Sequence, residues 1–299
     1  MNTIQEISLQ NWQDFWSMLY MHMGKSIMET CGRHGEAVIR SALQDIAQED
    51  GRRFREECLK QGGKPNLRAL YQLGCGCSAD PRMRSAVLND QEQMRIWEVY
   101  TCPMANLWLD HGQSFLANLY CEENQLELLN TFTDGKGQFH LSKKLTCHRE
   151  NGCRPDNYCR FSAYYRMANV DASKRAECFT QEGEEEVQLS TAETQEQALA
   201  RKCVQLIARL TAGAKAAFGQ EGLCAVSLGL RNLVAPTADM LLHYADMTLS
   251  GDLLDFVQKN LPVSLEPGRD ELWARYADEN SLRLYESGFA VPLKKRLNL

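Results

Sequence analysis

The chain has 299 residues, of which 44% are hydrophobic and 24% charged, and its formal net charge is −6. This composition is that of an ordinary globular protein, long enough for one large domain or two modest ones. The acidic balance and the lack of a basic run argue against nucleic-acid binding. No apolar stretch reaches the roughly 18 residues of a membrane span, and residues 1–12 do not resemble a signal peptide. We therefore expect a cytoplasmic protein with no membrane contact.

The chain contains twelve cysteines, which is more than incidental usage explains. A chain of this length has no need of disulfide bonds to hold its core, and no export signal is recognised. We therefore predict reduced thiols, some packed in the core as small apolar side chains and others available for chemistry.

Residues 11–60 are predicted to form two helices. The first carries an apolar stripe at three- and four-residue spacing, which is typical of one buried helix face. This stripe consists of Trp12, Phe15, Trp16, Leu19 and Met23. The second helix begins near Gly35 and ends at the glycines 62 and 63. Residues 64–81 are predicted to form a short helix and then an irregular loop.

The middle of the chain is predicted to form a small sheet. Residues 94–101 are short and rich in β-branched and aromatic side chains, which indicates a strand. Pro103 then begins a helix that runs through Phe115, and residues 119–130 favour helix. Two further strands, 139–147 and 159–166, face each other across turn residues as a hairpin. Alternation places Cys147 and Cys159 on the apolar faces of this hairpin.

Residues 171–196 are acidic and poor in large apolar side chains, so we predict a solvated linker there. It separates residues 1–170, with the cysteine cluster, from a helical region, 197–299. A weak internal repeat aligns residues 34–43 with 221–230, each behind a helix and a glycine. Two ordinary helical hairpins would give the same pattern, but we favour a duplication. The predicted fold class is α+β, mainly helical with a small antiparallel sheet.

Three cysteines and their neighbours form a family pattern. They occur as Cys102-Pro103, as Cys121, and in the run from Gly152-Cys153 to Tyr158-Cys159-Arg160-Phe161. The pattern resembles the L-2-amino-thiazoline-4-carboxylic acid hydrolase-like family, with its Cys-Pro step, second cysteine and late Cys-x-Phe strand. The Gly-Glu helices near 35–36 and 218–222 also look like that family. The resemblance covers roughly residues 15–165, with a partial second copy of the helical part behind the linker.

The chain departs from the family pattern at two places. The acidic residue that usually follows the second cysteine is represented only loosely, by Glu122 or Glu123. The hairpin loop is longer and holds the additional pair Cys147 and Cys153. The hairpin also resembles small-ligand-binding domains of the 4-vinyl-reductase type, in which the pocket need not be catalytic.

The resemblance implies a hydrolase that opens a cyclic amidine-like ring and produces a carbamoyl amino acid. An sp² carbon bonded to nitrogen and sulfur needs a nucleophile, a proton donor and charge stabilisation to react. Cys102 is our first candidate for the nucleophile, because a helix N-terminus lowers the pKa of a thiol. The alternative is a buried thiol at a strand end.

Cys121 and Cys159 would meet Cys102 if the first strand and the hairpin pack side by side. Three converging cysteines also suit zinc or an iron–sulfur cluster. No Cys-x-x-Cys pair occurs in the sequence, so a metal site requires that the fold brings the three separate cysteines together. A metal- or iron–sulfur-binding sensor, or a redox or desulfurising enzyme, is therefore the alternative function, and the cofactor is left open.

The remaining candidates lie on the predicted strands. His140 is a candidate general base on the polar face of its strand. Trp97 and Tyr100 are expected to line a substrate pocket, and Arg160 to hold a carboxylate, although such aromatics more often belong to the core and such an arginine to the surface. The expected partner is a small-molecule substrate. The helical C-terminal region offers a surface for homo-oligomers, and a non-catalytic scaffold is a third interpretation.

Overall fold

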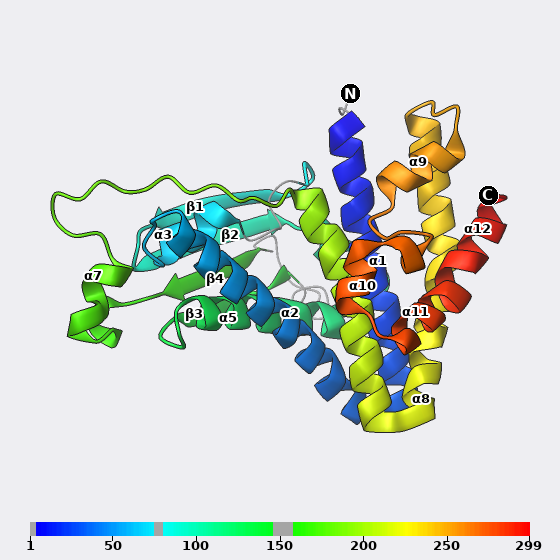
Figure 1. The fold of residues 1–299 in the computed structure, drawn as a ribbon, viewed down its shortest axis with the longest axis horizontal. Helices are drawn as coiled ribbons and strands as arrows, with labels where there is room; N and C mark the ends of the chain where they lie inside the picture. The colour runs from blue at the N-terminus through cyan, green and yellow to red at the C-terminus, as the bar shows by residue number, and fades with distance from the viewer. Residues whose placement is uncertain (1–3, 75–79, 146–157) are drawn as a thin grey trace.

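The computed structural model describes residues 4–74, 80–145 and 158–299 (Figure 1). It has the predicted α+β architecture, with many helices and a four-stranded antiparallel sheet. Figure 1 shows the sheet on one side of the molecule and the α1, α8 and C-terminal helices on the other. The predictions for Cys147 and Cys153 lie outside the described residues.

Two long helical hairpins form the frame. Helices α1 (Ile4–Cys31) and α2 (Arg33–Lys60) are joined at Gly32, and α8 (Gln195–Met247) is broken at Gly219. Both glycines have a positive φ, 61° and 59°, which strongly favours a residue without a Cβ. Residues 34–43 and 221–230 directly follow these turns, so the aligned segments share a structural context. The duplication itself stays a prediction.

Helix α1 packs along α8, and its buried side chains belong to the larger hydrophobic core. Phe15, Leu19 and Met23 of the predicted stripe are fully buried, which confirms the apolar face of this helix. The two helices approach closely because Gly229 of α8 has no side chain. A Cβ at Gly229 would lie only 2.8 Å from the Cα of Met23.

The sheet consists of β1 (Arg84–Asp90), β2 (Met94–Thr101), β3 (Gln138–Lys143) and β4 (Cys159–Tyr164). Its spatial order is β1-β2-β4-β3, with every neighbouring pair antiparallel. The strand predicted at 94–101 and the pairing of the two later strands are confirmed. The third strand is shorter than the predicted 139–147, and the sequence analysis missed β1.

Three helices accompany the sheet: α3 (Leu67–Leu73), α4 (Pro103–Asp110) and α5 (Ser114–Phe132). Helix α4 begins at Pro103 as predicted, but it ends before Phe115. The chain turns at Gly112, where φ is 68°, and α5 then starts as a separate helix. Helix α5 packs against α2 and also contacts β3. It therefore connects the sheet to the helical frame.

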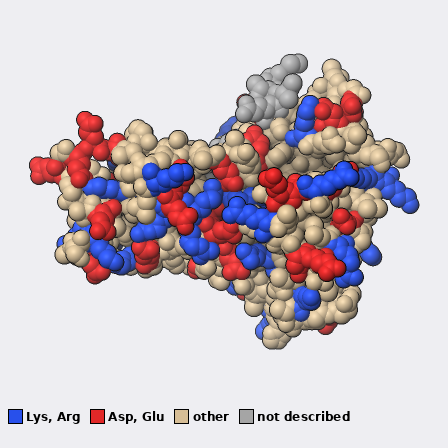
Figure 2. Space-filling model, in the orientation of Figure 1, with Lys and Arg blue, Asp and Glu red and all other residues tan. Residues whose placement is uncertain are grey.

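The remaining elements are short and mostly surround α8. They are η1 (Met167–Asn169), η2 (Ala172–Lys174), α7 (Arg175–Cys178), α9 (Leu253–Asn260), η3 (Pro267–Arg269), α10 (Glu271–Tyr276), α11 (Glu279–Tyr285), η4 (Glu286–Ala290) and α12 (Val291–Leu297). Between α7 and α8, an extended segment crosses the sheet side of the molecule (Figure 1). Glu184 and Glu186 of this acidic segment pair with Lys64 and Arg68. Figure 2 shows positive and negative side chains interspersed over the face that it draws.

A buried ion cluster ties α2 to the start of α8. Asp50 is 2% exposed, and its carboxylate lies 2.8 Å from Arg201 and 3.1 Å from Lys202. Arg53 lies 3.2 Å from the same carboxylate. Burial alone would raise the pKa of Asp50, but these cations lower it to about 2. The charged form is therefore stabilised in the folded protein.

We expect Asp50→Asn to destabilise the protein by about 3 kcal/mol at neutral pH, because three cations lose their buried counter-charge. The folded-state pKa of Asp50 is lowered, so its stabilisation is complete above about pH 4 and is lost as the pH falls toward 2. Urea unfolding between pH 2 and 7 measures this. The difference between the two proteins should shrink in acid. The exposed Asp45→Asn on the same helix is the control, and an equal loss there would contradict the assignment.

Candidate functional site

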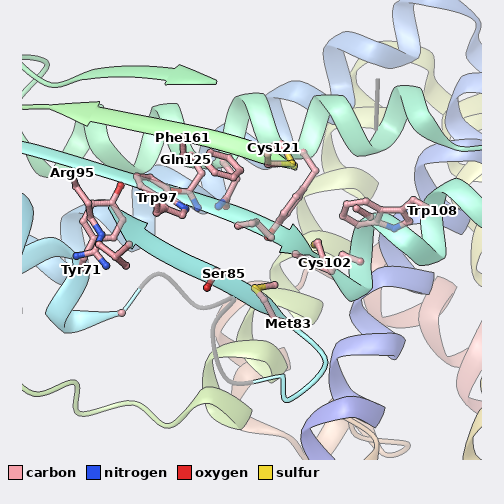
Figure 3. Close-up of a pocket in the computed structure, with 18 residues that line it drawn as sticks. Tyr71, Met83, Ser85, Arg95, Trp97, Cys102, Trp108, Cys121, Gln125 and Phe161 are labelled. Atoms are coloured by element: carbon pink, nitrogen blue, oxygen red, sulfur yellow. The ribbon is translucent and has the colours of Figure 1, made fainter. Parts of the chain in front are cut away.

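A cavity of about 220 Å³ lies between the sheet and helices α4 and α5 (Figure 3). Its lining is mainly aromatic and aliphatic, with a few polar groups, which is typical of small-molecule sites. The lining residues are Tyr71, Gly74, Met83, Ser85, Val87, Arg95, Trp97, Val99, Cys102, Met104, Ala105, Trp108, Tyr120, Cys121, Asn124, Gln125, Cys159 and Phe161.

Two periodicities bring these side chains together. Along β2, alternation places Arg95, Trp97 and Val99 on the face of the sheet that lines the cavity. On α5, Cys121 is followed by Asn124 and Gln125 at the three- and four-residue spacing of one helix face. The cavity is thus built by one face of a strand opposite one face of a helix.

Cys102 occupies the junction between β2 and α4. It is the N-cap of α4 in an extended conformation, with Pro103 at the first helical position, and its carbonyl accepts the N–H of Asn106 at 3.0 Å. The predicted position at a helix N-terminus is therefore confirmed. Its side chain is half-buried and reaches the cavity.

Cys121 and Cys159 line the same cavity as Cys102, so the structure brings all three predicted cysteines together. They come from α5, β4 and the start of α4. Cys159 is 5% exposed, and its sulfur accepts a hydrogen bond from the Leu145 N–H at 3.2 Å. This burial makes Cys159 the less accessible thiol, and it favours Cys102 as the reactive one.

An aromatic group forms one part of the lining. Trp97 stacks on Phe161 with the ring centroids 5.0 Å apart and the planes inclined by 10°, as expected from their direct pairing across β2 and β4. Tyr71 meets the other side of Trp97 at 5.1 Å, edge to face. Flat ligands pack favourably on such a surface.

Arg95 is the one charged side chain among the described residues of the lining. Its guanidinium donates to Asp90 and lies 4.5 Å from the ring centroid of Tyr71. Asn124 is 8% exposed and lines the cavity. The Oε1 atom of Gln125 is buried and has no hydrogen-bond partner among the described residues. These groups are available to a polar ligand, because buried polar atoms normally have hydrogen bonds.

Three predicted site residues do not line the cavity. Tyr100 lies on the opposite face of β2 from Trp97, because strand side chains alternate, and its hydroxyl donates to Glu98 at 2.7 Å. Arg160 lies 3.1 Å from the same carboxylate. His140 is exposed and pairs in register with Ser162. Of the two aromatic residues predicted to line a substrate pocket, Trp97 therefore lines this cavity and Tyr100 does not.

Arg95, Asn124 and Gln125 were not predicted from the sequence. A signal for each was present, because Arg95 lies two residues before Trp97 on a strand and the two amides follow Cys121 at helical spacing. In the described ranges, no group of three or more His, Cys, Asp or Glu side chains is arranged to hold a metal ion. None of the helices described is both long and apolar enough to cross a membrane.

The fold is α+β, and its cavity is largely apolar and lined by three cysteines. Residues 15–153 match the family model described as L-2-amino-thiazoline-4-carboxylic acid hydrolase, which confirms the family predicted from the cysteine pattern. The matched range includes Cys102 and Cys121 but ends before Cys159. Comparisons with curated proteins and with solved structures each found no match.

The cysteines are expected to differ in alkylation rate according to their burial. Exposed Cys224 should react first with iodoacetamide, half-buried Cys102 and Cys121 next, and buried Cys159 and Cys203 slowest. Peptide mass spectrometry over time measures the order. Protein unfolded in guanidinium is the control, in which the rates should converge. Alkylation of Cys159 as fast as that of Cys102 would contradict the geometry.

Proposed function

We propose that the cavity is the active site of a small-molecule hydrolase that opens a cyclic amidine or thiazoline-like ring. The observation that carries this proposal is the convergence of Cys102, Cys121 and Cys159 in one largely apolar cavity. The match of residues 15–153 to a family named for the hydrolysis of an aminothiazoline carboxylic acid supports the reaction class.

In this proposal Cys102 is the nucleophile. Its place at the N-terminus of α4 favours the thiolate, because the amide dipoles of a helix stabilise negative charge there. The thiolate attacks the sp² carbon, a carbon–sulfur bond forms, and the electron pair moves to the ring nitrogen. The tetrahedral adduct then collapses and breaks the ring carbon–nitrogen bond, and the nitrogen leaves with a proton. Water attacks the same carbon, and Cys102 departs as thiolate.

The neighbouring polar groups have assignable tasks. Asn124 and Gln125 line the cavity, and the buried Oε1 of Gln125 has no partner among the described residues, so these amides can hydrogen-bond the nitrogens of the amidine and stabilise the charge that develops on them. Tyr120 precedes Cys121 on α5 and also lines the cavity, so its hydroxyl is the candidate proton donor, whereas His140, predicted as the general base, is exposed and outside the cavity. Such a site needs reduced thiols, which fits the cytoplasm.

The same three thiols carry a second proposal, in which they bind zinc or an iron–sulfur cluster. The chain would then be a sensor or a redox or desulfurising enzyme. All three line one cavity, but among the residues that the structure describes they are not arranged as a group that could hold a metal ion, so they would have to move together to bind one. Metal content and the visible spectrum of anaerobically purified protein separate the two proposals, because a metal-free, colourless and active enzyme excludes the ligand role.

Cys102→Ser should lower the turnover of 2-amino-thiazoline-4-carboxylate at least about a hundredfold, because a hydroxyl is a much weaker nucleophile at neutral pH. Ring opening is followed by chromatography of the carbamoyl product. Exposed Cys224→Ser is the matched control and should keep full activity, since Cys224 lies on α8 outside the cavity. Unchanged turnover in the Cys102 variant would exclude the nucleophile role.

A further inference from the structure

The cavity has two chemically different ends. Figure 3 shows Arg95 and Tyr71 at one end and Cys102 and Trp108 at the other, with Trp97 and Phe161 between them. Strand β2 runs along this length. The six steps from Arg95 to Thr101, next to Cys102, correspond to about 20 Å of extended strand. The charged end and the thiol end are thus separated by much more than the size of one five-membered ring.

This separation conflicts with a small substrate that uses both ends. In an aminothiazoline carboxylic acid, the carboxylate and the carbon to be attacked are only a few bonds apart. Such a molecule can place its ring at the thiols or its carboxylate at Arg95, but it cannot do both. The cavity volume of about 220 Å³ also exceeds the roughly 150 Å³ that accommodates benzene in an engineered protein cavity.

The Arg95 end has the properties of an anion-binding group. The Arg95 side chain is 17% exposed, and in the described ranges its guanidinium makes one hydrogen bond, to Asp90. The Asp90 side chain is 46% exposed, and ion pairs with exposed partners are weak. A guanidinium has five N–H donors, so Arg95 retains donors for a carboxylate, which it can bind in bidentate geometry.

The middle of the cavity suits a flat apolar body. Trp97 and Phe161 stack there, and the unpartnered Oε1 of Gln125 requires an N–H or O–H donor. A matching ligand therefore has an anionic group at Arg95 and a flat apolar body with a hydrogen-bond donor in the middle. At the thiol end it has an electrophilic carbon.

We propose that the substrate is an elongated anion, with its carboxylate at Arg95, an apolar body across Trp97 and Phe161, and its reactive carbon at Cys102. This inference rests on the proposed function only for the chemistry at the thiol end. A compact aminothiazoline carboxylic acid then fills just part of the cavity, and Arg95 selects substrates by length.

The length dependence is measured with maleimides that carry a carboxylate on alkyl chains of increasing length. A thiol adds across the maleimide double bond, forming a carbon–sulfur bond while its proton goes to the neighbouring ring carbon. Suitable probes are 3-maleimidopropionic, 6-maleimidohexanoic and 11-maleimidoundecanoic acids, each with its neutral methyl ester. The rate of labelling of the cavity cysteines is measured by mass spectrometry on the full chain with Cys224→Ser.

The long acid should label the cavity cysteines about tenfold faster than its ester, because a charge-assisted hydrogen bond to Arg95 holds it in place. The short acid should show no such advantage. Arg95→Gln should abolish the advantage of the long acid, Arg95→Lys should keep part of it, and Arg84→Gln on exposed β1 should leave it unchanged. An equal advantage at every chain length, or an advantage that persists in Arg95→Gln, would overturn the proposal.

Labelling requires no turnover, so the outcome is separable from the proposed hydrolysis. Loss of turnover in Cys102→Ser together with length-independent labelling would leave the hydrolase and remove the elongated substrate. Length-dependent labelling of Cys121 or Cys159, with turnover unchanged in Cys102→Ser, would keep the elongated ligand and exclude Cys102 as nucleophile. Arg95→Lys and the wild-type length series still decide the question if Arg95→Gln does not fold.

Discussion

The site depends on the conversion of a strand into a helix at Cys102-Pro103. The proline ring fixes its own φ and lacks an N–H, so it disfavours continuation of the ladder in β2 while suiting the first turn of α4. The face of β2 that lines the cavity therefore ends at the N-terminus of α4. Pro103 therefore sets the order of three features along the chain. These are the apolar face of β2, the half-buried thiol of Cys102 and the N-terminus of α4.

The helical frame holds helices α4 and α5 in place. Trp108 of α4 donates its indole N–H to the carbonyl of Ser17 at 2.8 Å, and the hydroxyl of Tyr20 donates to the carbonyl of Leu116 on α5 at 2.8 Å. Both bonds are buried, so they are costly to break. Helix α1 thus positions the two helices that carry Cys102 and Cys121, although no α1 residue lines the cavity described.

Much of the architecture was readable from the sequence, because strong local patterns coincide with buried faces. The apolar stripe of α1, the strand before Pro103 and the cysteine pattern of the family are such signals. Strand β1 was not predicted, since its side chains are mostly exposed and leave no clean alternation. The break between α4 and α5 occurs at Gly112. It was not predicted because the apolar pattern continues across this glycine. Within the site, the cysteines were chosen by residue type. Arg95 and Asn124 were missed, although their spacing from Trp97 on a strand and from Cys121 on a helix placed them on the same faces. Tyr100 and Trp97 were grouped without regard to strand alternation, which places them on opposite faces of β2.

The turns at Gly32 and Gly219 are each a single residue long, so the two helical hairpins cannot change in length without rotating a helix. Each reverses the chain directly from one helix into the next, and three residues later Gly35 and Gly222 pass so close to the preceding helix that a Cβ would lie 2.9 Å and 2.1 Å from its carbonyl oxygens. One inserted residue would rotate everything beyond it by about 100° around the helix axis. For α2, that rotation would turn away the face that receives α5. Length variation in this chain is therefore confined to segments outside the two hairpins, such as the acidic stretch before α8, where the path can lengthen without turning a helix.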